Sequence, residues 1–224
     1  MGANPYGNRM HFSIQRITSG ELWYYRYDSN RGYLRQILPD ESGDAALEAD
    51  RIIGVFRQPT FIDKQIKMFV AVKSGAAYQL YTYTYEQKTS GSDIITCVGK
   101  KDITSWAGGM SDDCKMFTNG VEVPLNYLYI AKGNDLWRTS YESQADPKAV
   151  KSFPAPITAA EVVISTPNTL SENTKELYTA IFTYDTSAKT SKMYVLDART
   201  DDLKAYSEVE TAIPGKVVRY LANQ

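Results

Sequence analysis

Histidine and cysteine are almost absent from this chain of 224 residues, with one histidine, His11, and two cysteines, Cys97 and Cys114. A structural zinc site needs several converging nitrogen or sulfur ligands, so this inventory gives no such site. The sequence contains a repeated β pattern, and Cys97 falls in the outer part of one repeat unit whereas Cys114 falls in the inner part of the next. That separation exceeds disulfide reach, and we expect two free thiols. His11 stands on an apolar strand, where we expect it to pack or to donate a hydrogen bond.

Charge of one sign and long apolar runs are also lacking. The 25 Lys and Arg residues nearly balance the 26 Asp and Glu residues. Nucleic acids and anionic membrane surfaces select strongly basic faces, so we expect neither as a partner. No apolar run approaches the ~20 residues of a membrane-spanning helix, and we expect no membrane insertion.

Motifs that carry chemistry are missing as well. No GxSxG, GxxxxGK[ST] or GxGxxG segment occurs, and there is no DxDxDG calcium loop. Acyl transfer through a nucleophile elbow and nucleotide binding therefore have no sequence support. Acidic pairs at 112–113 and 201–202 are isolated in turns and are weak grounds for a cation site. We expect no metal, no cofactor and no catalytic residue.

What the sequence does contain is a repeated β pattern, seen most clearly at residues 176–206. Residues 177–184 and 192–197 are rich in aromatic and β-branched side chains, and polar turn residues follow each of these runs. This composition is typical of strands joined by tight turns.

The pattern recurs along the whole chain at a nearly constant spacing. An acidic residue ends the second strand of each unit, and successive residues of this kind lie 58, 56 and 55 residues apart: Asp28, Glu86, Glu142 and Asp197. A constant period of this size indicates a repeat architecture in which each unit buries its apolar faces against neighbours. Because these acids recur at strand-to-turn junctions, we expect them to accept backbone hydrogen bonds there rather than to catalyse.

Each unit has three strands, and the later units have a fourth strand in front. The first unit lacks one, whereas the chain ends with a β-rich segment, residues 216–222. If that segment pairs beside residues 11–18, four sheets of four strands close into a ring. The sequence therefore predicts an all-β, β-propeller-like domain over residues 1–224, with about four antiparallel blades closed by the C-terminal strand. A β-sandwich and part of a larger propeller remain the alternatives. The acidic, Ala-rich residues 40–50 read as a connection, in which one helical turn is expected.

Three aromatic residues are the candidate ligand contacts. Trp106 lies in the most irregular segment, TSWAGGMSDD, beside two glycines, and loops on a rigid scaffold often carry binding residues. Tyr83 belongs to a ladder with Tyr81 and Tyr85, which serves either as a sugar-stacking platform or, more commonly, as an inter-sheet core. Trp137 matches Trp23 in the repeat register, which also suits a structural role.

The segments LWYYRYDSNRG, YLYIAKGNDLWRTS and KMYVLDARTDD, with the ending AIPGKVVRYLANQ, resemble the propeller portion of PKD-like lipoproteins of Bacteroidota. The resemblance implies an exported protein, outside the cytoplasm, of a group often associated with polysaccharide uptake. It supplies no catalytic motif. The chain departs from the family pattern in lacking a lipidation cysteine and a PKD module. A four-bladed ring would also resemble hemopexin-type propellers in shape, without their repeat signature.

Two functions follow from these observations. The favoured one is a non-catalytic binding or scaffold domain whose ligand is a glycan or a partner protein, because aromatic residues are abundant and no reactive constellation is present. The alternative is a propeller glycosidase or lyase that uses carboxylates in its funnel. Two carboxylates about 5 to 10 Å apart that face an aromatic cleft would favour the enzyme.

Overall fold

The computed structural model describes residues 2–3, 9–28, 32–57, 66–86, 88, 92–118, 127–140, 143–165, 176–197, 203–204 and 212–218. Seventeen β-strands occupy most of these residues, and the longest helical piece among them is the 3-10 turn η1 (Trp106–Gly108). The chain forms two compact units, Met1–Ser105 and Trp106–Gln224.

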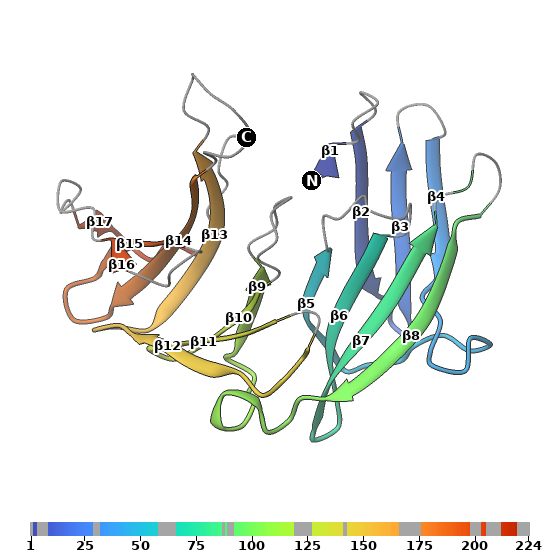
Figure 1. Ribbon diagram of the computed structural model, residues 1–224, viewed down its shortest axis with the longest axis horizontal. Helices are drawn as coiled ribbons and strands as arrows, with labels where there is room; N and C mark the ends of the chain where they lie inside the picture. Colours follow the sequence, from blue (N-terminus) through green and yellow to red (C-terminus); the bar gives the residue numbers. More distant parts are fainter. Residues whose placement is uncertain are drawn as a thin grey trace. The chain divides into compact units, whose positions relative to one another are not determined.

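The first unit contains two antiparallel sheets of four strands, each connected in simple sequence order (Figure 1). The strands of the first sheet are β1 (Gly2–Ala3), β2 (Arg9–Arg16), β3 (Leu22–Asp28) and β4 (Gly32–Ile37). Those of the second are β5 (Arg51–Arg57), β6 (Ile66–Ser74), β7 (Ala77–Glu86) and β8 (Ile94–Asp102).

Period-two alternation builds the core of the first unit. On β3, Leu22 and Tyr24 are buried, whereas Trp23 and Tyr25 between them are partly exposed. Successive side chains on a strand point to opposite faces, so one face of this sheet is buried. The buried residues form one apolar cluster with side chains of the second sheet: Ile14, Leu22, Tyr24, Leu38, Leu47, Ala49, Met68, Val70, Val72, Tyr81, Tyr83 and Tyr85.

A charged pair lies inside this apolar cluster. Arg26 of β3 donates from Nη1 to Asp93 Oδ1 at 3.0 Å, and the two side chains are 3% and 0% exposed. Tyr85 Oη donates to the other carboxylate oxygen at 2.9 Å, and the backbone N–H of Lys88 donates to Oδ1 at 3.3 Å. Gln36 donates to the backbone oxygen of Asp93 at 3.1 Å. Buried charges persist when they are paired in this way, and here they connect the two sheets.

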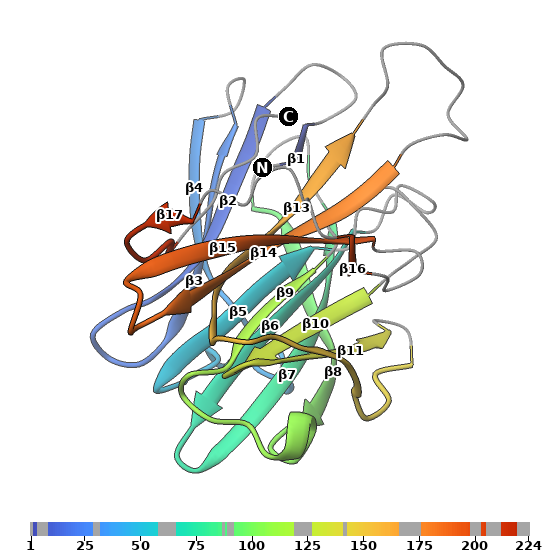
Figure 2. The same ribbon diagram turned by 90° about the vertical axis from the view of Figure 1, so that its left-hand side faces the viewer.

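The second unit repeats the same plan (Figure 2). Its first sheet contains β9 (Lys115–Thr118), β10 (Tyr127–Lys132), β11 (Asp135–Ser140) and β12 (Lys148–Ser152). The second contains β13 (Ile157–Ser165), β14 (Glu176–Asp185), β15 (Thr190–Asp197) and β16 (Leu203–Lys204), and β17 (Ile213–Pro214) also pairs with β15. The buried cluster between these sheets consists of Tyr129, Ala131, Leu136, Phe153, Ile157, Ile181 and Leu196.

Register shifts occur at a few places in the ladders. In β5, Ile52 faces Val72 and Gly54 faces Ala71, so Ile53 is an extra residue. In β13, Ile157 faces Thr183 and Ala159 faces Phe182, which makes Thr158 the extra residue. Each is a β-bulge, which bends and twists its strand while the pairing continues on both sides.

The fold class predicted from the sequence is confirmed. The chain is all-β, and its four antiparallel meanders of four strands are blades of the β-propeller type. The prediction of one domain over residues 1–224 stays a prediction. Cys97 and Cys114 are free thiols, as expected.

Two expectations about the ends of the chain differ from the structure. The first unit does have a fourth strand, because Gly2 and Ala3 pair with Met10 and Arg9. Of the predicted closing strand, residues 216–218 are not a strand. Instead, the N–H of Val217 donates to Ser191 Oγ at 3.0 Å, and its carbonyl accepts from Thr158 Oγ1 at 2.6 Å. Residues 219–222 lie outside the described residues.

The connection at residues 40–50 contains turns and isolated bridges rather than a helical turn. The strand-ending acid Glu86 pairs with the ammonium of Lys88 at 2.6 Å. That these acids accept backbone hydrogen bonds stays a prediction. Glu142 and the side chains of His11, Asp28 and Asp197 lie outside the described residues.

Candidate functional site

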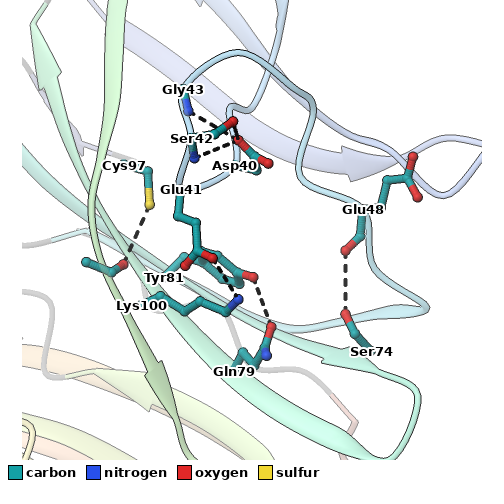
Figure 3. A network of polar contacts seen from close by, with 11 residues as sticks. Asp40, Glu41, Ser42, Gly43, Glu48, Ser74, Gln79, Tyr81, Cys97 and Lys100 are labelled. Atoms are coloured by element: carbon teal, nitrogen blue, oxygen red, sulfur yellow. Dashed lines mark hydrogen bonds and ion pairs between the residues drawn. The ribbon is translucent and has the colours of Figure 1, made fainter.

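A polar pocket of about 340 Å³ lies in the first unit, where the connection between its two sheets passes over β7 and β8 (Figure 3). Its lining consists of Asp40, Glu41, Ala45, Ala46, Leu47, Glu48, Tyr81 and Lys100. This volume is at the small end of the range for ligand pockets, which is about 300 to 1,000 Å³.

Backbone hydrogen bonds hold the connection in place. The N–H of Leu47 donates to Leu38 O at 2.8 Å, and the N–H of Leu22 donates to Leu47 O at 2.7 Å. Leu22, Leu38 and Leu47 are all buried, so apolar packing supports these bonds. At the tip, the N–H of Asp40 donates to Ala45 O at 2.8 Å. The loop that forms the pocket wall is therefore held by backbone hydrogen bonds at its base and across its tip.

Asp40 serves the turn itself. Its Oδ1 accepts hydrogen bonds from Ser42 Oγ at 2.6 Å, from the N–H of Ser42 at 2.9 Å and from the N–H of Gly43 at 3.2 Å (Figure 3). These donors, the Ser42 hydroxyl first, lower the pKa of the Asp40 carboxyl. Gly43 has φ +85°, a conformation that glycine adopts without strain. Asp40 is therefore a hydrogen-bond acceptor and not a proton donor.

Lys100 and Glu41 face each other across the pocket. The ammonium nitrogen of Lys100 lies 3.3 Å from Glu41 Oε1 and 5.6 Å from the centre of the Tyr81 ring. Partial burial disfavours the Lys100 charge, but Tyr81 and Glu41 outweigh it and raise the Lys100 pKa. The pair is partly exposed, with side chains 32% and 60% accessible, so solvent weakens it. Both groups can exchange this contact for a ligand.

The floor of the pocket is anchored by the tyrosine ladder of β7. Tyr81 Oη donates to Gln79 Oε1 at 2.9 Å, and Tyr83 Oη donates to Pro39 O at 2.8 Å, immediately before Asp40. The rings of Tyr81 and Tyr83 are stacked, with centroids 6.4 Å apart. Burial raises the pKa of both hydroxyls, so both donate as neutral phenols. The ladder fixes the pocket loop from behind.

The pocket lining combines hydrogen-bond acceptors with a donor, as hydroxyl-rich ligands require. Among the lining residues, Asp40, Glu41 and Glu48 are acidic and Lys100 is basic. Ionised carboxylates accept hydrogen bonds from hydroxyls strongly, and an ammonium donates up to three. With three carboxylates and one ammonium, the lining is negative overall and repels acidic ligands.

The structure places the three sequence-predicted ligand contacts elsewhere. Tyr83 is fully buried and lies directly behind the pocket, as in the inter-sheet interpretation of the ladder. Trp106 begins η1 in the second unit and is only 1% exposed. Trp137 lies on β11 and is half-buried, with its ring N–H enclosed. Ligand contact by these three residues stays a prediction, and their burial gives Tyr83 and Trp106 packing roles.

Sequence reasoning did not single out Asp40, Glu41 or Lys100. The segment Asp40–Gly43 has the composition of an Asx turn, which could have located the loop tip. The approach of Lys100 depends on strand register, which that composition does not reveal.

The described ranges contain no group of three or more His, Cys, Asp or Glu side chains arranged to hold a metal ion. Asp113, one of the paired acids, accepts a short hydrogen bond from Ser111 Oγ, whereas residues 201–202 lie outside the described residues. Across the same part of the chain, no helix is both long and apolar enough to cross a membrane. Comparison of the chain with protein-family models, with curated proteins and with solved structures found no match.

Proposed function

We propose that this protein is a non-catalytic binding domain whose ligand is a neutral glycan, held in the pocket beneath the loop of Asp40–Glu48. The single observation that carries the proposal is the polar lining of a volume of about 340 Å³, to which three acidic residues and Lys100 contribute. That space accepts roughly one or two sugar rings, and sugar hydroxyls match both kinds of group.

Neutral sugars fit better than acidic ones. A uronic acid or a sulfated sugar would bring a negative charge toward Asp40, Glu41 and Glu48, and Lys100 already pairs with Glu41. A negatively charged ligand in the pocket would be repelled by these carboxylates, even near a protein surface. The glycan rather than a partner protein is therefore the ligand that this pocket supports.

We favour binding over glycoside cleavage because Asp40 is held as a hydrogen-bond acceptor by its own turn. A glycosidase needs a general acid whose pKa is raised, and Asp40 does not fit that role because hydrogen bonds from its own turn lower its pKa. We also propose that the protein acts outside the cytoplasm, at the cell surface or in the periplasm, where polymeric glycans are met. The resemblance of its repeat segments to exported lipoproteins supports this location.

Glycan-array screening followed by calorimetry tests the proposal. Wild type is expected to bind neutral oligosaccharides and to bind acidic ones weakly. Lys100→Met and Glu41→Gln each remove one charged hydrogen-bonding group and should raise the Kd about tenfold or more. Lys148→Met, on exposed β12 of the second unit, is the matched control and should bind like wild type.

Three results would overturn the proposal: no neutral glycan bound by wild type, equal affinity in all variants, or release of a shortened sugar during incubation. Circular dichroism of each variant separates lost binding from lost folding.

A further inference from the structure

The irregular segment at residues 104–113 contains three successive residues with left-handed backbone. Ala107 has φ +53°, Gly108 φ +70° and Gly109 φ +100°. An added Cβ at either glycine would meet nothing within 4 Å, so backbone conformation rather than space requires glycine there. Ala107 has no such freedom and adopts this region at a cost of roughly 1 to 2 kcal/mol. Some compensating interaction must hold the turn.

That interaction is an ammonium placed among three carbonyl groups. Nζ of Lys132 lies 3.3 Å from Ala107 O, 3.3 Å from Gly108 O and 2.7 Å from Gly109 O. An ammonium has three N–H donors, and three acceptors from consecutive residues surround this one. Lys132 is the last residue of β10, and pairing of β10 with β9 and β11 fixes its position.

We propose that the backbone of residues 107–109 is a carbonyl site for a monovalent cation or a protonated primary amine, and that Lys132 supplies its built-in occupant. Carbonyl oxygens in a ring or cradle replace the hydration shell of monovalent cations, and they receive an ammonium in the same way. The positive charge, rather than the hydrocarbon stem of Lys132, then holds the turn.

The turn lies directly beside a large buried side chain. Trp106 immediately precedes the three residues and is 1% exposed, and the N–H of Gly109 donates back to Trp106 O at 3.0 Å. When the cation leaves, three carbonyls lose a charged donor and Ala107 loses the compensation for its strain. The indole is then released from its buried position, which its fluorescence reports.

Chemical rescue tests this proposal. Lys132→Ala opens the site, and it should lower the Tm by about 5 °C and shift tryptophan emission to longer wavelength. Methylammonium chloride should restore part of the loss, and potassium chloride should restore some of it. Tetramethylammonium chloride at equal concentration should not, because it has no N–H and is too large to approach three carbonyls.

The controls separate a cation site from general salt effects. Wild type and Lys148→Ala should respond equally to all three salts. Lys132→Met keeps a stem in the space without a charge, and it should lose stability without rescue by methylammonium. A Lys132→Ala variant as stable as wild type, or one rescued equally by tetramethylammonium, would overturn the proposal. If Lys132→Ala does not fold, Lys132→Met is tested in its place. A Lys132→Met variant with the Tm of wild type would then overturn the proposal.

Discussion

Arg26 and Asp93 form a buried ion pair between two sheets, at an Nη1 to Oδ1 distance of 3.0 Å and a separation of 67 residues in sequence. The Asp93 carboxylate also accepts from Tyr85 Oη and from the N–H of Lys88. Its two oxygens are therefore satisfied from three directions. Such a pair is costly to break from one side, because the remaining charge stays buried.

Arg26→Ala is accordingly expected to reduce the free energy of unfolding by about 3 to 5 kcal/mol. The double variant Arg26→Met with Asp93→Leu removes both charges, and it should be more stable than Arg26→Ala. Urea unfolding followed by circular dichroism measures both. Equal stability of Arg26→Ala and wild type would show that solvent reaches Asp93.

The buried tyrosines of the first unit give a pH prediction. Burial raises the pKa of Tyr85 to about 12, and it raises the pKa of Tyr24 and Tyr83 as well. An unfolded tyrosine titrates near pH ~10, so above that pH the folded chain holds more protons than the unfolded chain. This contribution is complete below about pH 10 and is lost as the pH rises toward 12.

We therefore expect the urea midpoint to fall steeply above about pH 10. Tyrosinate absorbance near 295 nm should rise in two phases, exposed rings first and the buried ladder together with unfolding. A single phase centred near the ordinary tyrosine pKa, with the fold intact, would contradict this assignment.

Tyr83→Phe should remove the support of the pocket loop. The buried carbonyl of Pro39 loses its 2.8 Å donor, at a cost of about 1 to 2 kcal/mol. Tyr27→Phe makes the same chemical change at a side chain that is 54% exposed and should cost little. Thermal unfolding compares the two variants. An equal loss of stability in both would show that the hydrogen bond to Pro39 O does not stabilise the fold.

Gly54→Ala should clash with a neighbouring ring. A Cβ at this position would overlap the ring of Phe56, which is itself 4% exposed. Overpacking of this kind costs typically about 1 to 3 kcal/mol. In the Phe56→Leu background the ring is gone and the added cost should shrink. A double-mutant cycle by urea unfolding measures this coupling, and strict additivity would argue against the clash.

The strands were predictable because their side chains alternate. The run Tyr81, Tyr83 and Tyr85 is buried on one face of β7, and Thr82 and Thr84 between them are half-buried, as period two requires. The repeat spacing then indicated how many sheets to expect. The two-residue strand β1 has no such pattern, because neither Gly2 nor Ala3 brings a side chain that marks a strand.

The pocket was not predictable in the same way, because it depends on a register shift. Tyr85 faces Ile95 and Tyr83 faces Cys97, so even counting would place Tyr81 opposite Gly99. The shift between Thr82 and Tyr83 instead sets Tyr81 opposite Lys100. Alternation alone does not locate such a bulge. The prominence of Trp106 in the sequence reflected its unusual neighbours, which serve the turn at residues 107–109.

The bulge at Ile53 makes this position of β5 tolerant of a one-residue deletion. Since this residue has no partner of its own in the β6 ladder, its deletion would join Ile52 and Gly54 into regular pairing and leave every other side chain on its own face. Deletion of a paired residue such as Val70 would instead move the side chains of the rest of its strand to the opposite face of the sheet. Naturally shortened relatives that keep this architecture should therefore lose their residue at the bulge.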